Sequence, residues 1–322
     1  MTTTTTTTTT MTTFLKLIRW PNLIIIVLSM SFMLVFIIKP GLDIKVFSDG
    51  LTFAEFALLV VSTLLIAIGG YIINDVSDIN TDSINKPGKN IIGKMVSVEF
   101  AYRLYWITTC TGIITGALLS YLINQINFSL IFVFSAGLLW FYSQKYKCQP
   151  LVGNIVISFL SSLSFALVWL FEFYALSNNA AVFVNVQSDF PLINRLLIIY
   201  MGFAFMVSLL REVIKDIEDY KGDNRFGCLT FTVKYGISAS KLIALIVAYI
   251  SLFSSGLIQY YFFNANFNLL FSAFFLIDLL LIVIIGLLHK ASSKPNYTRL
   301  SLMIKILMLV GILSMILFYF EI

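Results

Sequence analysis

Apolar stretches alternate with short polar segments along almost the whole chain. Most of these stretches are long enough to cross about 30 Å of hydrocarbon as a helix, which takes roughly 20 residues. We therefore predict an all-α, polytopic membrane protein with a single transmembrane domain over residues 14–322. The threonine-rich, low-complexity segment over residues 1–13 is expected to be disordered. The nine expected helices lie near residues 22–38, 53–73, 102–123, 128–143, 151–177, 192–210, 241–263, 268–288 and 300–320.

The composition supports a membrane protein. Of the 322 residues, 59% are hydrophobic and only 11% are charged, and the mean hydropathy is +0.94. A soluble domain carries roughly 25% charged residues, so this chain has too few to cover a surface in water. The composition thus excludes a soluble protein, and the recurrence of apolar stretches excludes a single signal peptide on a soluble domain.

Basic residues are distributed unevenly between the predicted loops. If the nine helices cross the membrane in alternation, all 21 Lys and Arg residues fall on one side except Lys39, Lys45 and Arg195. Cytoplasmic loops are rich in Lys and Arg, which places the N-terminus inside the cell and the C-terminus on the opposite side. Loop orientation and contact with anionic lipid headgroups account for the formal net charge of +5, so we expect no nucleic-acid partner.

The cysteine pattern carries no sign of a structural framework. Cys110, Cys148 and Cys228 are scattered and lack the close spacing of metal-binding or redox pairs. We therefore expect neither a disulfide framework nor a zinc site. The single histidine, His289, ends an apolar stretch and is expected at the membrane interface.

A first acidic motif directly follows the second predicted helix and reads Asn-Asp-Val-Ser-Asp-Ile-Asn-Thr-Asp over residues 74–82. If the helix continues, a spacing of four residues keeps these oxygen ligands on nearly one face. The ligands are Asn74, Asp78 and Asp82, with Asp75 beside them. Mg²⁺ prefers such hard oxygen ligands, and the nearby Lys86 and Lys89 can hold free phosphate oxygens.

A second acidic motif follows the sixth predicted helix, on the same side of the membrane. On a helix, Asp216, Asp219 and Asp223 are three and four residues apart and share one face. Carboxylates this close repel one another unless cations lie among them. Together the motifs predict two Mg²⁺ ions that bridge one diphosphate and neutralise it as a leaving group. We expect Asp78, Asp82, Asp219 and Asp223 to be the catalytic residues.

The two motifs resemble those of the UbiA superfamily of intramembrane prenyltransferases. The first motif of that family, Asn-Asp-x-x-Asp-x-x-x-Asp, is matched at residues 74–82, and Asn85-Lys86-Pro87 also matches the family pattern. Its second motif, Asp-x-x-x-Asp, is matched at residues 219–223. The chain departs from the pattern at Lys89-Asn90, where many members have Arg-Pro. The longer second run, followed by Phe226-Gly227, resembles the digeranylgeranylglyceryl phosphate synthase-like and homogentisate-type branch.

The resemblance implies a UbiA-like bundle of about nine helices and a Mg²⁺-dependent enzyme that transfers a polyprenyl group from a prenyl diphosphate to a membrane-associated acceptor. The branch favours a glycerol-phosphate lipid as the acceptor. An aromatic acceptor of quinone biosynthesis is the close alternative, and a cation-dependent membrane transporter is the alternative from another class. The resemblance also implies a set of diphosphate contacts, which are Lys86, Lys89, Tyr142, Lys145 and Arg211.

Overall fold

The computed structural model describes residues 13–88 and 90–322, and in this part of the chain the structure is helical, without a strand. The expected disorder of residues 1–12 and the predicted diphosphate contact Lys89 lie outside the described residues. A short helix over residues 13–17 comes first. It is followed by α2 (Trp20–Phe32), a π-helical turn (Met33–Ile38), α3 (Lys39–Gly41), α4 (Phe53–Ser77), α5 (Ile79–Asn85), α6 (Val98–Leu122), α7 (Ser129–Gln144), α8 (Val152–Ser177), α9 (Ala180–Val186), α10 (Phe190–Arg225), α11 (Phe231–Tyr235), α12 (Ile237–Asn264), α13 (Asn268–Lys290) and α14 (Lys294–Phe318).

The predicted all-α, polytopic architecture is confirmed. Within the described residues, eight helical segments are long and apolar enough to cross a membrane. The remaining expected span corresponds to α6, which has 25 residues but is less apolar because Thr, Gly and Tyr residues interrupt its hydrophobic positions. The largest boundary difference is at α10, which continues to Arg225 instead of ending near residue 210. This polar extension stays helical and buries Val213, Ile214 and Ile217, because α5 packs against it.

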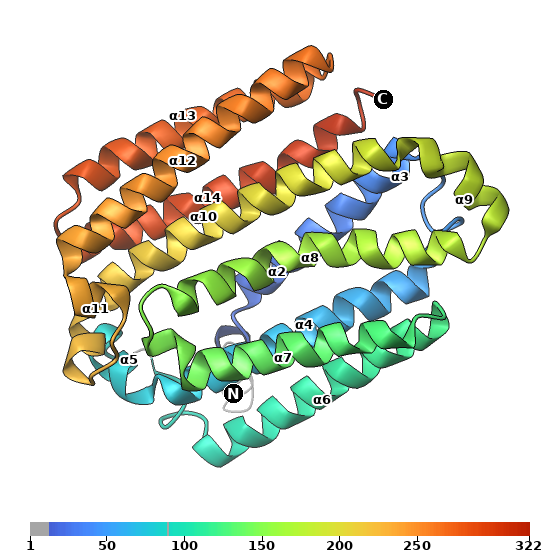
Figure 1. Cartoon of the computed structure of the whole chain (residues 1–322). Helices are drawn as coiled ribbons and strands as arrows, with labels where there is room; N and C mark the ends of the chain where they lie inside the picture. The colour runs from blue at the N-terminus through green and yellow to red at the C-terminus, as the bar shows by residue number, and fades with distance from the viewer. Residues whose placement is uncertain (1–12, 89) are drawn as a thin grey trace, which may run out of the picture.

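Six of the helices form a closed ring (Figure 1). Around the ring, α2 packs on α4, α4 on α7, α7 on α8, α8 on α10, α10 on α14, and α14 back on α2. Outside it, α6 covers α4 and α7, and the hairpin of α12 and α13 covers α10 and α14. Both acidic motifs lie at the end of the ring where α5 and α11 are found (Figure 1).

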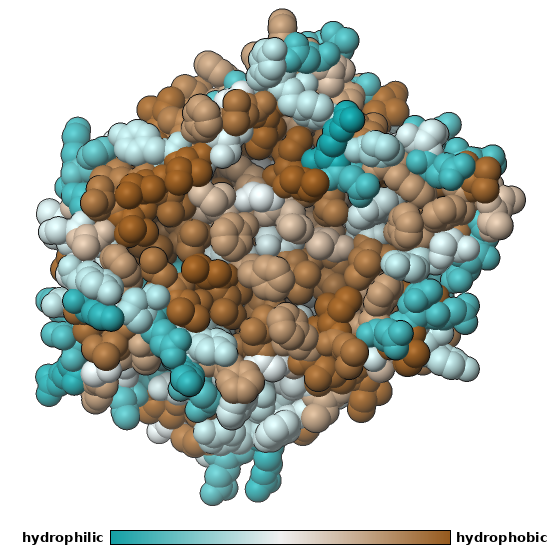
Figure 2. All heavy atoms as spheres, viewed as in Figure 1, coloured by the Kyte–Doolittle hydropathy of each residue, from teal (hydrophilic) through white to brown (hydrophobic). Residues whose placement is uncertain are grey.

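The outer surface has the polarity of a membrane-spanning bundle. Figure 2 shows apolar side chains across the middle of the viewed face and hydrophilic side chains gathered toward the ends of the helices. Many large apolar side chains are exposed along the outer helices, among them Phe253 and Leu257 on α12 and Leu276 and Ile282 on α13. In water such a surface would be unfavourable, but hydrocarbon solvates it.

A buried ion pair closes the end of the bundle opposite the acidic motifs. Nζ of Lys39 donates to Oε1 of Glu172 at 2.6 Å, and the two side chains are 1% and 0% exposed. The backbone N–H of Leu51 donates to the other carboxylate oxygen at 3.1 Å. The position of Lys39 after an apolar stretch indicates a free loop cation. In the structure it is instead a buried partner of Glu172.

The expectation that the cysteines form no disulfide is wrong. Cys148 and Cys228 are joined across a sequence separation of 80 residues, with their Cα atoms 4.6 Å apart. The bond links the turn after α7 to the loop after α10. Sequence spacing could not reveal this pair, because the approach of these two segments depends on the packing of the whole ring. Cys110 is free and exposed.

Candidate active site

A polar pocket lies between the two acidic motifs. It receives side chains from α5, α10, the turn after α7 and the start of α8. The four aspartates expected to be catalytic all line it. The titratable lining consists of the carboxylates Asp78, Asp82, Glu212, Asp216, Asp219 and Asp223, the lysines Lys86, Lys147 and Lys215, and Tyr142.

A close approach of α5 and α10 holds the two motifs opposite each other. The backbone N–H of Gly222 donates to Oδ1 of Asn85 at 2.8 Å. A Cβ at Gly222 would lie 2.6 Å from the carbonyl oxygen of Thr81 and 2.5 Å from Nδ2 of Asn85. Only glycine lets these backbones come this close, so Gly222 sets the width of the pocket between the motifs.

The first motif keeps the predicted spacing despite a break in the helix. α4 ends at Ser77 and α5 begins at Ile79, with Asp78 between them. The backbone bonds nevertheless continue, from Asp78 N to Asn74 O at 2.9 Å and from Asp82 N to Asp78 O at 2.8 Å. Nδ2 of Asn74 also donates to Oδ2 of Asp78 at 2.9 Å. The four-residue stagger therefore survives, and Asp78 and Asp82 line the same pocket.

The second motif lies on the extended end of α10, as the spacing predicts. Asp216, Asp219 and Asp223 all line the pocket. Nδ2 of Asn154, in the first turn of α8, donates to Oδ2 of Asp216 at 2.9 Å. The carbonyl oxygen of Asp223 accepts a bond from the N–H of Cys228 at 2.9 Å. The second motif is thus fixed from α8 on one side and from the disulfide loop on the other.

Three lysines compensate part of the negative charge. Lys147 forms an ion pair with Asp78, Nζ of Lys86 lies 3.0 Å from Oδ1 of Asp82, and Nζ of Lys215 lies 3.8 Å from an oxygen of Glu212. Burial lowers the pKa of Lys147 to about 8, and the nearby Lys215 acts in the same direction. Three cations against six carboxylates leave the pocket negative, which favours the binding of further cations.

The donor set fits Mg²⁺ in kind. Among residues 13–88 and 90–322, no three His, Cys, Asp or Glu side chains come close enough together to hold a metal ion by themselves. Mg²⁺ does not need such a cluster, because it is usually held by one or two carboxylates together with water and substrate phosphates. Oδ1 of Asn74 is buried without a hydrogen-bond partner in the described structure, which leaves an oxygen donor beside the aspartates.

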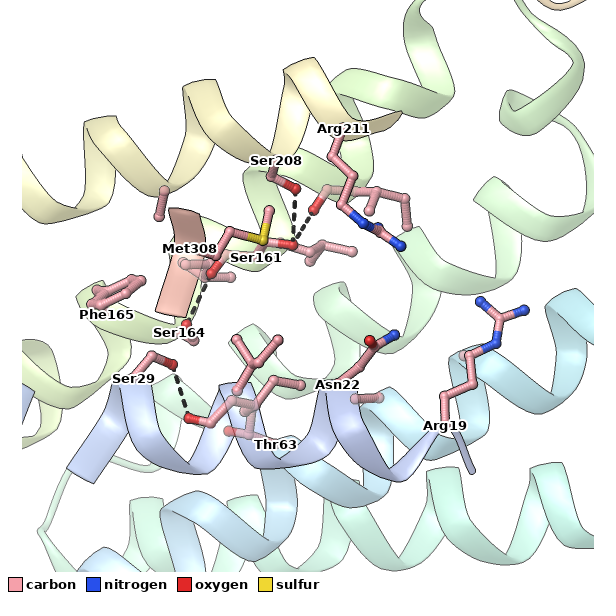
Figure 3. A pocket seen from close by; sticks show the side chains of 18 of the residues that line it. Arg19, Asn22, Ser29, Thr63, Ser161, Ser164, Phe165, Ser208, Arg211 and Met308 are labelled. Carbon is pink, nitrogen blue, oxygen red and sulfur yellow. Dashed lines mark hydrogen bonds between the residues drawn. The ribbon is translucent and has the colours of Figure 1, made fainter. Parts of the chain in front are cut away.

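The polar pocket adjoins a much larger cavity inside the helix ring (Figure 3). This cavity has a volume of about 540 Å³ and is lined from α2, α4, α7, α8, α10 and α14. Its deep part is mostly apolar and includes Phe132, Phe165 and Met315. Tyr142, Glu212 and Lys215 line both spaces. The arrangement can therefore hold a polar headgroup at one end and an apolar chain at the other.

The remaining predicted site residues lie in several places. Asp75 does not line the polar pocket and forms an ion pair with Arg19. Asn74 and Arg211 line the large cavity, and NH1 of Arg211 lies 2.6 Å from Oε1 of Glu212. Lys145 is exposed and lies outside both linings. Lys147, two residues later, enters the polar pocket in its place.

Sequence reasoning missed several residues that line the site. Lys147 and Lys215 are ordinary loop or interface cations by position, and nothing in the sequence separates Lys147 from Lys145. Glu212 lies one turn before Asp216, so helical spacing provides a signal for it. Asn154 has a different signal, because the pair Gly153-Asn154 resembles a further segment of the UbiA family. Lys305 lines the large cavity from α14 and had been assigned to the cytoplasmic surface.

Comparison with known proteins agrees with this geometry. A model of the UbiA prenyltransferase family matches residues 46–313. A digeranylgeranylglyceryl phosphate synthase of Sulfurisphaera tokodaii is 35% identical over 240 residues, which cover 74% of this chain and 77% of the relative.

Two solved structures show the same fold. A chain from a structural study of digeranylgeranylglyceryl phosphate synthase in membranes has a TM-score of 0.59 at 24% identity, covering 97% of this chain and 99% of that chain. A UbiA homolog from Archaeoglobus fulgidus, bound to GPP and Mg²⁺, has a TM-score of 0.60 at 15% identity and covers 94% and 99% of the two chains. With the family model spanning most of its length, this chain belongs to the UbiA prenyltransferase family of integral membrane enzymes.

Proposed function

We propose that this protein transfers a polyprenyl group from a polyprenyl diphosphate to a membrane glycerol-phosphate lipid, with Mg²⁺ as the cofactor. The observation that carries the proposal is the acidic pocket that opens onto a large, mostly apolar cavity. The relative in Sulfurisphaera tokodaii is named for a glyceryl phosphate product, and the Archaeoglobus fulgidus homolog was solved with a prenyl diphosphate and Mg²⁺. Both support the proposed substrates.

In the proposed reaction, the bond between C1 of the prenyl chain and the diphosphate oxygen breaks, and the diphosphate leaves with the bonding electrons. The hydroxyl oxygen of the acceptor forms an ether bond with C1, and the hydroxyl proton passes to the departing diphosphate. The products are the ether and a protonated diphosphate, so atoms and charge balance. The apolar cavity holds the prenyl chain and excludes water, which would otherwise capture the allylic carbon.

The residues of the polar pocket would divide the work on the diphosphate. Asp78, Asp82, Asp219 and Asp223 would hold two Mg²⁺ ions, with Asn74 and Asp216 in support. Bound Mg²⁺ supplies positive charge that stabilises the leaving diphosphate. Lys86, Lys147 and Lys215 would contact the phosphate oxygens that the metals leave free. Tyr142 lines both the polar pocket and the large cavity.

We also propose that the end with the acidic motifs faces the cytoplasm, with the N-terminus inside and the C-terminus outside. The bias of Lys and Arg toward that side supports this orientation. Labelling of single cysteines placed after α5 and after α14 in intact cells tests it. Labelling from outside is expected only near the C-terminus, and the reverse pattern would contradict the orientation.

The activity is tested with purified protein in lipid nanodiscs, supplied with Mg²⁺ and geranylgeranyl diphosphate. One arm receives geranylgeranylglyceryl phosphate and the other an aromatic acceptor such as homogentisate, and products are identified by mass spectrometry. The expected result is an ether of the glycerol phosphate that is lost with EDTA and in the Asp219→Asn variant. A product only in the aromatic arm would shift the assignment to aromatic prenylation. No product in either arm, together with cation flux in proteoliposomes, would overturn the enzyme proposal in favour of transport.

A further inference from the structure

The two adjoining spaces of the site carry opposite charge. The polar pocket has six carboxylates and three lysines in its lining. The large cavity has five cations, Lys16, Arg19, Arg211, Lys215 and Lys305, and one carboxylate, Glu212. An acidic pocket attracts an anion only through metal ions, whereas a basic cavity attracts an anion directly. The charges therefore indicate two anion sites with different chemistry.

Lys305 is the cation that the diphosphate pocket does not explain. It lies eleven residues after Lys294, the first residue of α14, which is about 16 Å along the helix at 1.5 Å per residue. Its Nζ lies 3.3 Å from Oδ1 of Asn22 on α2. Within the described residues it has no carboxylate at ion-pair distance. A lysine that follows the start of an apolar membrane helix and faces its interior is costly and marks a functional site by default.

The neighbours of Lys305 include an unused hydrogen-bond donor. Arg211, Lys215, Arg19 and the carboxylate of Glu212 lie within electrostatic reach of it. The Nε of Arg211 is buried without a hydrogen-bond partner in the described structure, although its NH1 contacts Glu212. Figure 3 shows Arg211, Asn22 and Arg19 at the same end of the cavity, on helices that face each other across it. A cation without a carboxylate at ion-pair distance and a donor without an acceptor thus face the same space.

We propose that Lys305, together with Nε of Arg211 and the side-chain amide of Asn22, binds the phosphate group of the acceptor lipid directly, without a metal ion. The inference rests on the proposed function and assigns the part of the cavity that recognises the acceptor. Lys215 is assigned to the diphosphate. Glu212 on Arg211 and Asp75 on Arg19 offset two of the other four cations, so two positive charges remain, which balance a dianionic phosphate monoester. An acceptor with a carboxylate in place of the phosphate would leave more of this positive charge uncompensated.

Separate sites of different chemistry also solve a problem of the proposed reaction. The hydroxyl oxygen of the acceptor must come within bonding distance of C1 of the prenyl diphosphate. Both substrates carry phosphate groups, and the negative charges of these groups repel one another. When one anion is held through metals among aspartates and the other among lysine and arginine, neither substrate competes well for the site of the other. The acceptor phosphate then fixes the position of its hydroxyl group relative to C1 of the prenyl chain, so Lys305 is a specificity-determining and positioning residue.

The test compares binding of two lipids that differ only in the phosphate, geranylgeranylglyceryl phosphate and geranylgeranylglycerol, to the wild type and to Lys305→Met in nanodiscs. The wild type is expected to bind the phosphorylated lipid about 10- to 100-fold more tightly, as expected for a charged hydrogen bond. Lys305→Met is expected to lose most of this difference, and Lys305→Arg to keep part of it. Lys290→Met, at an exposed end of α13 on the same side, serves as the matched control and should bind like the wild type.

The same variants are tested with the unreactive geranylgeranyl S-thiolodiphosphate in the presence of Mg²⁺. Binding of this analogue by Lys305→Met within about twofold of the wild type is expected. Weaker binding of the analogue, with no change for the lipid phosphate, would overturn the proposal and assign Lys305 to the donor substrate. Equal wild-type affinity for both lipids, or Lys305-dependent binding of an aromatic carboxylate alone, would also overturn it. Because these assays require no turnover, a preference for the phosphorylated lipid without any transfer would refute the proposed function and leave the anion site standing.

Discussion

The closeness of α5 and α10 at Gly222 leads to a specific prediction about catalysis. In Gly222→Ala, the added Cβ would lie 2.6 Å from the carbonyl oxygen of Thr81, whereas ordinary contacts begin near 3.4 Å. The oxygen belongs to the backbone of α5, so the helices must separate by about 0.8 Å, the difference between these two distances. The shift moves the first motif away from the second and weakens the bond from Gly222 N to Asn85.

The effect on activity is expected to exceed the effect on stability. Overpacking costs about 1–3 kcal/mol, and alanine regains about 1 kcal/mol over glycine inside a helix, so the net loss of stability is small. A misplacement of about 1 Å in a catalytic site can lower the rate about 100-fold. We expect a fall of about that size in kcat for prenyl transfer, with little change in the thermal unfolding temperature in detergent.

A matched variant isolates the cause. Gly256→Ala lies in α12, where a Cβ would meet no atom within 4 Å, and it should keep the wild-type rate with equal or higher stability. A wild-type rate for Gly222→Ala would refute the reasoning, because it would show that the motifs tolerate a wider separation.

Three further predictions concern contacts around the site and at the far end of the bundle. Glu172→Leu or Lys39→Met alone should destabilise the protein by about 3–5 kcal/mol, because each leaves a buried charge unpaired. The double variant should cost less stability than either single variant. Thermal unfolding measures these losses, and a double variant whose loss equals the sum of the two would contradict the prediction. Asn154→Ala removes the donor to Asp216 and should raise the Mg²⁺ concentration for half-maximal activity about 10- to 100-fold; an unchanged Mg²⁺ titration would contradict this role. Cys148→Ser should lower the stability by about 2–4 kcal/mol. It should also weaken diphosphate binding, because the disulfide holds the turn with Lys147 against the loop after Asp223. Cys110→Ser is the control, and identical behaviour of the two variants would rule out a contribution of the disulfide.

The helices and the two motifs could be predicted from the sequence because they depend on local pattern. Apolar stretches of membrane length specify where helices lie, and the spacing of Asp78 and Asp82, or of Asp219 and Asp223, specifies a shared face. The continuation of α10 to Arg225 was underestimated because span prediction follows hydrophobicity, while this segment is kept helical by its packing on α5.

Contacts between distant segments could not be predicted. The bond between Gly222 and Asn85 joins residues 137 positions apart, the ion pair of Lys39 and Glu172 joins residues 133 positions apart, and the disulfide spans 80 residues. Lys305 illustrates the same limit. Its position near one end of an apolar stretch is typical of an interface cation, and only the packing of α14 against α2 shows that it faces a cavity.

The central claim is that the two acidic motifs form a single site for one Mg²⁺-bound diphosphate. The most direct test is a double-mutant cycle with Asp82→Asn and Asp219→Asn, in which binding of geranylgeranyl S-thiolodiphosphate is measured with and without Mg²⁺. If the motifs act together, each single variant loses most of the Mg²⁺-dependent affinity, and the double variant loses little more than either one. Losses that simply add, or a single variant that keeps its Mg²⁺-dependent affinity, would contradict the claim.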